Sequence, residues 1–398
     1  MARVDYRRRK TFQIYAVALL LILSVFILSA CNADSGAFDV SDGTVSEPSH
    51  FIARLMYGLD DDIAVFGWSV VAFTVILKLV LSPLDIWQKV VSRRNAKAME
   101  RMRPQLEALA EKCGDDKQRY QQEQMALYKK EKYSMLGACL PSIITLVVFF
   151  VVFTGFREMV GYQFAQDYVS SYNVFVSSME EQLGEDYESF EKTEENAEKY
   201  NAAVEVAQQA VHDNYFSEER TNKRGFLWIH NIFVSDNWQD GVPDYLVATG
   251  QEGFGMSRIT GVMKDEYDLV MGKVIGADEA GWGAGDASWN GWLLLPALSI
   301  ALSFVSQKLL TKSQGAPPPS VDGKKGGDGM QGSMKMMQYF MPIMIGVFSL
   351  FYSAAFALYT FTSSLVSVVF QLGFTLVGKI LDKREERKKG GFAPSVRR

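Results

Sequence analysis

Histidine and cysteine are both scarce in this chain of 398 residues, with three of each. The histidines are widely separated, and no cluster of His, Cys, Asp and Glu has the spacing of a metal site. The sequence also lacks a glycine-rich phosphate loop and a dinucleotide-binding glycine pattern. We therefore expect no enzymatic activity, no cofactor and no metal, so that any work the protein does draws on an external source of energy.

Two further absences narrow the class of protein. Two of the three cysteines, Cys113 and Cys139, lie in a basic segment and an apolar run, so the chain offers no disulfide framework. No internal repeat is found, which weakens the interpretation as a transporter built from inverted repeats.

What the chain does have is long uncharged runs. Hydrophobic residues make up 48% of the sequence, and they are bunched between strongly charged segments. This pattern predicts an all-α membrane protein with several spans. The formal net charge of −5 averages over segments of opposite sign and says little about partners.

Residues 1–30 have the features of a secretion signal. Four basic residues, Arg7 to Lys10, precede an apolar run and the sequence Leu28-Ser29-Ala30-Cys31, which resembles a bacterial lipobox. The resemblance implies that Cys31 is acylated, for example with palmitate, and becomes the first residue of the mature chain. The alternative is an ordinary signal anchor with a chance cysteine.

The first mature span, residues 64–86, carries a single lysine within about twenty apolar residues. A cation in the hydrocarbon region is costly unless it faces a hydrated interior or reaches the headgroups. At helical spacing Thr74, Ser82 and Asp85 share a face with Lys78, which gives the helix one polar side. The alternative is that Lys78 merely snorkels to the near interface.

Charge bias assigns the segments to the two sides of the membrane. Residues 87–132 contain twelve Lys/Arg and seven Asp/Glu, whereas residues 158–290 contain eight Lys/Arg and 25 Asp/Glu. By the positive-inside rule the first is cytoplasmic, and it is predicted to form a helical hairpin with an N-cap at Asp116. The hairpin either meets the ribosome or a client chain, or is only a solvated surface. Within the acidic outer segment, the aromatic stretch Phe226 to Phe233 is expected to lie at the membrane interface.

The rest of the chain completes five mature spans. Residues 336–378 carry no charge, and one helix of that length would be about 65 Å long, so the run is predicted to fold into two spans that turn near residues 352–355. The basic tail then lies in the cytoplasm. The predicted order is as follows: signal peptide 1–30, outer segment 31–63, first span 64–86, hairpin 87–133, second span 134–157, acidic outer insertion 158–290, third span 291–310, cytoplasmic loop 311–335, fourth span 336–353, fifth span 354–378, and cytoplasmic tail 379–398.

Two other spans carry polar stripes at three- and four-residue spacing. Such stripes often serve only as packing contacts between membrane helices. Together with the lysine they favour a polar cavity in the bilayer. The predicted lining comprises Thr74 and Ser82 on the first span, Ser299 and Ser303 on the third, and Thr360, Ser363, Ser364, Ser367 and Gln371 on the fifth.

Several motifs together resemble those of the YidC/Oxa/Alb family of membrane protein insertases, in the lipoprotein form found in Gram-positive bacteria. Lys78 falls where that family carries a groove arginine. The other matches are Met102-Arg103-Pro104, Asp116-Lys117-Gln118 and Leu127-Tyr128-Lys129 in the hairpin, Leu136 to Pro141 entering the second span, Phe226 to Asp236 outside, Met341 to Met344, and Leu358-Tyr359 with Ser363 and Gln371. Departures from the family pattern occur at Ala138, Thr145, Val147, Ser353, Ala355 and Ser364.

The resemblance implies an insertase and chaperone of the bacterial plasma membrane that works without nucleotide hydrolysis. A positively charged groove, open to the cytoplasm and to lipid, would receive the polar leader of a client while apolar segments move into lipid. The implied partners are nascent membrane proteins, membrane lipids and possible contacts with ribosome and Sec translocon, with no DNA. The alternatives are a small-solute or ion transporter that uses the same cavity, and a lipoprotein whose outer domain binds an extracellular ligand.

Overall fold

The computed structural model describes residues 37–63, 65–114, 116–131, 133, 135–184, 196–238, 240–252, 258–275, 289–314, 343–344 and 346–390. The predicted signal peptide and the predicted lipidation site Cys31 lie outside these residues. The described chain is mostly helical, as expected of an all-α membrane protein, and divides into two compact units. One unit comprises residues 1–73, 141–296 and 347–359, and the other comprises residues 74–140, 297–346 and 360–398.

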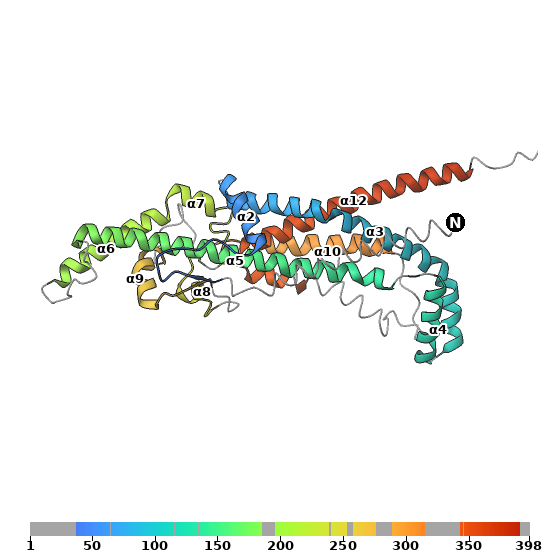
Figure 1. Ribbon diagram of the computed structural model, residues 1–398. Coiled ribbons are helices and arrows are strands. Elements are labelled where there is room, and N and C mark those ends of the chain that lie inside the picture. The colour runs from blue at the N-terminus through green and yellow to red at the C-terminus, as the bar shows by residue number, and fades with distance from the viewer. Residues whose placement is uncertain are drawn as a thin grey trace, which may run out of the picture. The chain divides into compact units, whose positions relative to one another are not determined.

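The elements follow one another as β1 (Phe38–Asp39), α2 (Phe51–Asp62), α3 (Phe66–Cys113), α4 (Lys117–Lys130), α5 (Met135–Leu183), α6 (Ala197–Tyr215), α7 (Glu218–Arg224), α8 (Tyr245–Thr249), β2 (Ile259–Thr260), α9 (Lys264–Ile275), α10 (Leu294–Gln314) and α12 (Ala354–Gly390). The two short strands pair in parallel, with Phe38 opposite Ile259. Figure 1 shows α3 and α5 as long continuous helices.

Three described helices are long and apolar enough to cross a membrane, within Phe66–Cys113, Val147–Leu183 and Ala354–Gly378. A shorter apolar helix covers Leu294–Ser306. The helical residues 346–351 end in a break at Tyr352 and Ser353 before α12 begins, at the place where the sequence predicts a turn. That the uncharged run forms two spans stays a prediction.

The first unit has an aromatic core between α5 and residues 347–359. Phe153 lies 5.5 Å from Phe348, 4.8 Å from Tyr352 and 5.4 Å from Phe356, measured between ring centroids. Rings of this size bury much apolar surface, and their mostly edge-on geometry is favourable. They fasten the start of α12 to α5.

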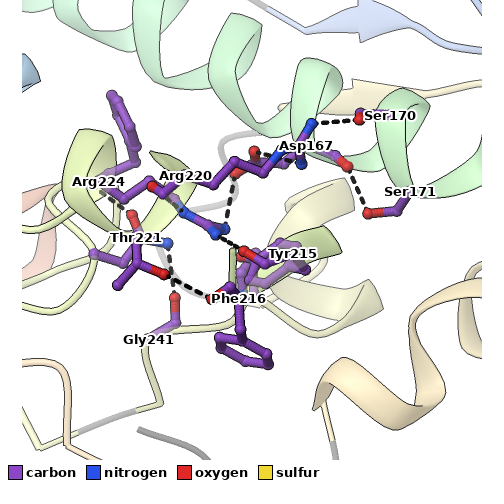
Figure 2. Close-up of polar contacts among 12 residues, drawn as sticks. Asp167, Ser170, Ser171, Tyr215, Phe216, Arg220, Thr221, Arg224 and Gly241 are labelled. Carbon is purple, nitrogen blue, oxygen red and sulfur yellow. Dashed lines mark hydrogen bonds and ion pairs between the residues drawn. The ribbon is translucent and has the colours of Figure 1, made fainter. Parts of the chain in front are cut away.

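A buried arginine holds the outer helices of this unit together. Figure 2 shows Arg224 of α7 reaching Asp167 of α5, with 3.4 Å between Nη1 and Oδ2, and donating to the carbonyl of Tyr215 at the end of α6. The guanidinium also lies 3.8 Å from the centre of the Tyr215 ring. Burial raises the pKa of Tyr215 to about 12, so its phenol is neutral here. Since a buried charge is tolerated only with partners, Arg224 couples three helices.

The second unit contains the predicted charged hairpin. Asp116 accepts a hydrogen bond from the backbone of Arg119 at 3.0 Å and caps α4, as the sequence predicts. Lys112 lies 3.6 Å from Glu123 across the two arms. A small apolar cluster fills the space between them, formed by Ala98, Met99, Met102, Leu106 and Tyr128.

Candidate functional site

Helices α10 and α12 of the second unit are joined by three side-chain hydrogen bonds. Ser299 pairs with Thr360 at 2.8 Å, Ser303 with Ser364 at 3.0 Å, and the amide of Gln371 donates to Ser306 at 2.8 Å. The partners advance together along both chains, so the two helices run in the same direction. The polar stripes predicted on these two spans therefore face each other.

Lys78 of α3 contacts a different part of α12. Its ammonium donates a hydrogen bond to Ser367 Oγ at 3.0 Å, and Ser367 in turn donates to the carbonyl of Ser363 at 2.9 Å. The Ser367 hydroxyl proton is used on its own helix, which leaves a lone pair directed at the ammonium. The structure thus gives Lys78 a partner within the protein, which a lysine that only snorkels to the headgroups does not require.

The polar neighbours of Lys78 on α3 differ in their surroundings. Thr74 is fully buried, whereas Ser82 and Asp85 are half-buried. The Ser82 hydroxyl donates to the carbonyl of Leu79 at 2.7 Å, as serines in membrane helices often do. Asp85 is the carboxylate that interacts electrostatically with Lys78. Asp85 also interacts with Lys89, so two cations share one carboxylate and leave a local field that a further charged group can alter.

The predicted lining residues therefore fall into two sets. Ser367 contacts Lys78 and is bonded to the carbonyl of Ser363, while Ser299, Ser303, Thr360 and Ser364 hydrogen-bond one another between α10 and α12. Gln371 belongs to the second set through its amide nitrogen, but its side-chain oxygen is buried and has no hydrogen-bond partner among the described residues. Their exposure to a common cavity stays a prediction.

One contact of α12 was not foreseen from the sequence. The guanidinium of Arg93, further along α3, packs on Gly378 so closely that a Cβ there would lie 3.1 Å from Nη1. In the sequence, Arg93 is one of many cations of a basic segment. The lone glycine near the end of the apolar run is the one feature that indicates a close approach by another group. A second cation of α3 therefore lies against the fifth span.

The first turns of α10 and α12 belong to the first unit, where the segment 231–236 fastens them. Asp236 is fully buried and accepts hydrogen bonds from the backbone of Leu293 at 3.1 Å and Leu295 at 2.8 Å. The carbonyls of Val234 and Ile232 accept from Ala354 at 2.7 Å and Ala355 at 2.8 Å. These acceptors satisfy amides at the starts of both helices, which have no partners within the helix.

The aromatic stretch Phe226 to Phe233 is largely buried in the protein, and its position relative to the membrane interface stays a prediction. Phe226, Ile229, Ile232 and Phe233 are at most 6% exposed, so these four apolar side chains are buried in the protein. Gly291 shows how tight the packing is, because a Cβ there would lie 2.0 Å from Asp236 Oδ1. Much of the stretch serves as core, and Leu227 is the exception, with 68% exposure.

The family described as 60Kd inner membrane protein matches residues 58–377, which is most of the chain and includes Lys78 and all the predicted lining residues. The chain belongs to this family. Its membership confirms the YidC/Oxa/Alb resemblance and does not favour the transporter alternative.

Individual relatives in this family are similar to the chain over shorter stretches. The membrane protein insertase YidC of Ectopseudomonas mendocina is 35% identical over 116 residues, or 29% of this chain and 19% of the relative. Its counterpart in Stenotrophomonas maltophilia (strain K279a) is 41% identical over 88 residues, which is 22% of this chain and 15% of the relative. The membrane protein insertase YidC of Paracoccus denitrificans is 36% identical over 105 residues, which is 26% of this chain and 15% of the relative. The chain thus aligns with less than a fifth of the length of each of these relatives.

As a membrane protein of this family, the chain carries its candidate site on apolar helices. In the parts of the chain that the structure describes, no group of three His, Cys, Asp or Glu residues is placed to hold a metal ion. The arrangement offers an ammonium, hydroxyls and an amide within apolar helices. Such a set can attract an acidic or polar chain and release it, since each contact it offers is a single hydrogen bond or the attraction of one ammonium.

Proposed function

We propose that this protein is a membrane protein insertase and chaperone that inserts integral membrane proteins through a hydrophilic, positively charged groove. The observation that carries the proposal is the Lys78–Ser367 contact, 3.0 Å long, between two apolar helices of a chain in this family. A cation that is bonded to a serine of a neighbouring helix is retained at a depth where it is otherwise costly.

The mechanism needs no nucleotide. The Lys78 ammonium attracts the acidic or polar leader of a client, and the low dielectric of the surroundings strengthens that attraction. The leader then has a shorter apolar path to cross. Burial of the client's apolar segments in lipid supplies the free energy, because it removes apolar surface from water.

We propose that the groove opens to the cytoplasm and is closed outside. Support for this opening comes from the family of the chain, because the YidC/Oxa/Alb resemblance implies a groove of this kind. A polar chain that enters from the cytoplasm would then meet protein, not water, at the outer end.

We propose five mature spans, with the acidic insertion outside and the tail in the cytoplasm of a bacterial plasma membrane. The parallel direction of α10 and α12 supports the count, because two spans that run the same way require an odd number of crossings between them. The opposite charge biases of the hairpin and the insertion support the sides.

We further propose the Gram-positive, lipoprotein type of anchor, with Cys31 acylated after removal of residues 1–30. Its support is the lipobox-like sequence that follows a basic and apolar leader. The partners we propose are nascent membrane proteins, with the charged hairpin as the surface for a ribosome or a Sec translocon. No enzymatic step is part of the proposal.

The test is an insertion assay in vesicles with paired clients that differ only in the charge of the leader. Lys78→Arg is expected to retain insertion, because it keeps the cation. Lys78→Gln should lower insertion of the acidic-leader client by about tenfold if the charge contributes roughly 1–2 kcal/mol, and spare the neutral one. Lys78→Glu should be the most severe variant.

Lys97→Gln is the matched control, since it removes a cation from an exposed position of the same helix. It should insert both clients normally. If Lys78→Gln inserts both clients as well as the unchanged protein at equal expression, the lysine has no part in insertion. Depletion of the protein in cells, followed by an inventory of membrane proteins that fail to insert, identifies the clients.

A further inference from the structure

The outer segment contains a tight turn whose most exposed residue is an apolar one. Phe226 and Ile229 exchange two backbone hydrogen bonds of 2.9 Å, which closes a four-residue turn over Leu227 and Trp228. Leu227 has a φ of 56°, in the left-handed region where glycine or asparagine is the usual residue. Its side chain is 68% exposed. A bulky apolar residue thus adopts an unfavourable backbone conformation and still leaves most of its side chain exposed.

The turn is fastened to the beginning of α3. The ring of Phe226 lies directly on Gly67, where a Cβ would come within 2.1 Å of the ring. Trp68 meets the same ring edge-on, with 5.3 Å between centroids and an interplanar angle of 83°. Glycine at position 67 therefore permits the close approach, and the turn lies at the level where the first apolar span starts.

Trp68 begins an exposed apolar stripe along that span. It is 56% exposed, and Val75 and Leu79, at 37% and 56%, follow at intervals of seven and eleven residues, which places all three on one face of the helix. Side chains so exposed on a membrane-spanning helix face lipid. Leu227 is attached through Phe226 to the first residue of this stripe.

We propose that the turn formed by residues 226–229 is seated in the outer leaflet, with Leu227 inserted among the lipids beside Trp68. The partner is the lipid surface itself. Transfer of the leucine side chain from water to lipid offsets the cost of its backbone conformation. The exposure of Leu227, its backbone geometry and the course of α3 do not depend on whether Lys78 serves insertion.

The test compares single labelled positions in the purified full-length protein, reconstituted in phosphatidylcholine vesicles. An environment-sensitive fluorophore is attached to Leu227→Cys, Val80→Cys or Met263→Cys, each with Cys113→Ser and Cys139→Ser. Val80 is 69% exposed within the span, and Met263 is 73% exposed in the outer domain just before α9. The two serve as lipid-facing and water-facing controls.

Spin-labelled phosphatidylcholine should quench the fluorophore at 227 several-fold more strongly than at 263, and aqueous iodide should show the reverse order. Adding Gly67→Ala should displace the Phe226 ring and reduce lipid quenching at 227, while quenching at 80 stays unchanged. The proposal is overturned if position 227 behaves like 263 toward both quenchers. It is also overturned if neither iodide nor spin-labelled lipid quenches the fluorophore at position 227, which would mean that protein covers the turn.

Discussion

Lys78 stands where the family resemblance implies an arginine, and its contact with Ser367 shows what a lysine requires at this position. An ammonium is a compact charge with three donors and no fixed plane, so a single hydroxyl such as Ser367 suffices to hold it. An arginine at this position would present a planar fork and would fit a carboxylate in two-point contact. In the proposed groove, the lysine would therefore supply attraction with less geometric demand than an arginine.

At the same scale, His50 gives the outer segment a dependence on pH. Its Nδ1 accepts a hydrogen bond from the backbone of Ile52 at 3.3 Å and caps α2, which requires that nitrogen to be unprotonated. Burial lowers the pKa of His50, and the opposing effect of Glu158 is smaller. The carboxylate of Glu158 accepts hydrogen bonds from the backbone of Ser49 and His50 at 2.6 and 2.8 Å.

A histidine whose pKa is lower in the folded state is protonated more readily when unfolded. Its contribution to stability is thus complete above its unfolded pKa of about 6.5 and is lost as pH falls through the folded pKa. We expect the unfolding temperature to fall by a few degrees between pH 7.5 and pH 5. His50→Asn keeps a capping acceptor without titrating, so its slope in that range should be smaller. An equal slope would assign the pH dependence to other groups.

At the scale of elements, the hydrogen-bonded pairs between α10 and α12 can have either of two roles. They can pack the two helices together, or they can line a cavity. Serines and threonines at helical spacing predict a polar face, and the structure confirms that those of α10 and α12 lie on matching faces. Whether they also face a cavity depends on their environment. A stability measurement distinguishes a packing role from a lining role.

A double-mutant cycle on Ser303 and Ser364 provides that measurement. Each single change to alanine is expected to destabilise the protein by about 0.5–1.5 kcal/mol, with a coupling of about 0.6 kcal/mol between them. Insertion of clients should change little if the pair only packs the helices. Ser82→Ala is the control, because its hydroxyl bonds to its own helix. Additive effects of Ser303→Ala and Ser364→Ala would show that the hydrogen bond contributes nothing measurable.

Sequence patterns predicted the elements better than their contacts. The apolar runs, the Asp116 cap and the break near Tyr352 could be predicted because each depends on neighbouring residues. The bond between Lys78 and Ser367 joins residues 289 positions apart, and nothing local in either segment specifies it. The continuation of α5 to Leu183 was missed for another reason, since charges after residue 156 mark the end of an apolar run and not of a helix.

At the scale of the whole molecule, the proposed topology can be read from labelling. Gln121→Cys lies on the exposed side of α4 and Glu181→Cys near the outer end of α5. Glycines at the nearby turns, Gly114 and Gly184, have positive φ and are poor sites for a cysteine. With Cys113→Ser and Cys139→Ser, an impermeant thiol reagent added to intact cells should label position 181 and leave position 121 unlabelled. The opposite pattern would invert the topology.

The lipid anchor is tested by the mass of the mature protein. We expect a species that begins at Cys31, carries acyl chains and lacks residues 1–30. Cys31→Ala should retain the leader and abolish the acyl mass, while the apolar helices still hold the chain in the membrane. Recovery of residues 1–30 in the membrane-bound protein would favour an ordinary signal anchor.

Helix α5 has a mechanical consequence. It is unbroken from Met135 to Leu183, and 49 residues at about 1.5 Å each give a rod of about 73 Å, more than twice the thickness of the hydrocarbon layer. A tilt of about ten degrees at its base would carry the far end through about 13 Å for a rod of that length. The rod is a lever, and a load applied to its far end exerts a torque on the part that crosses the membrane.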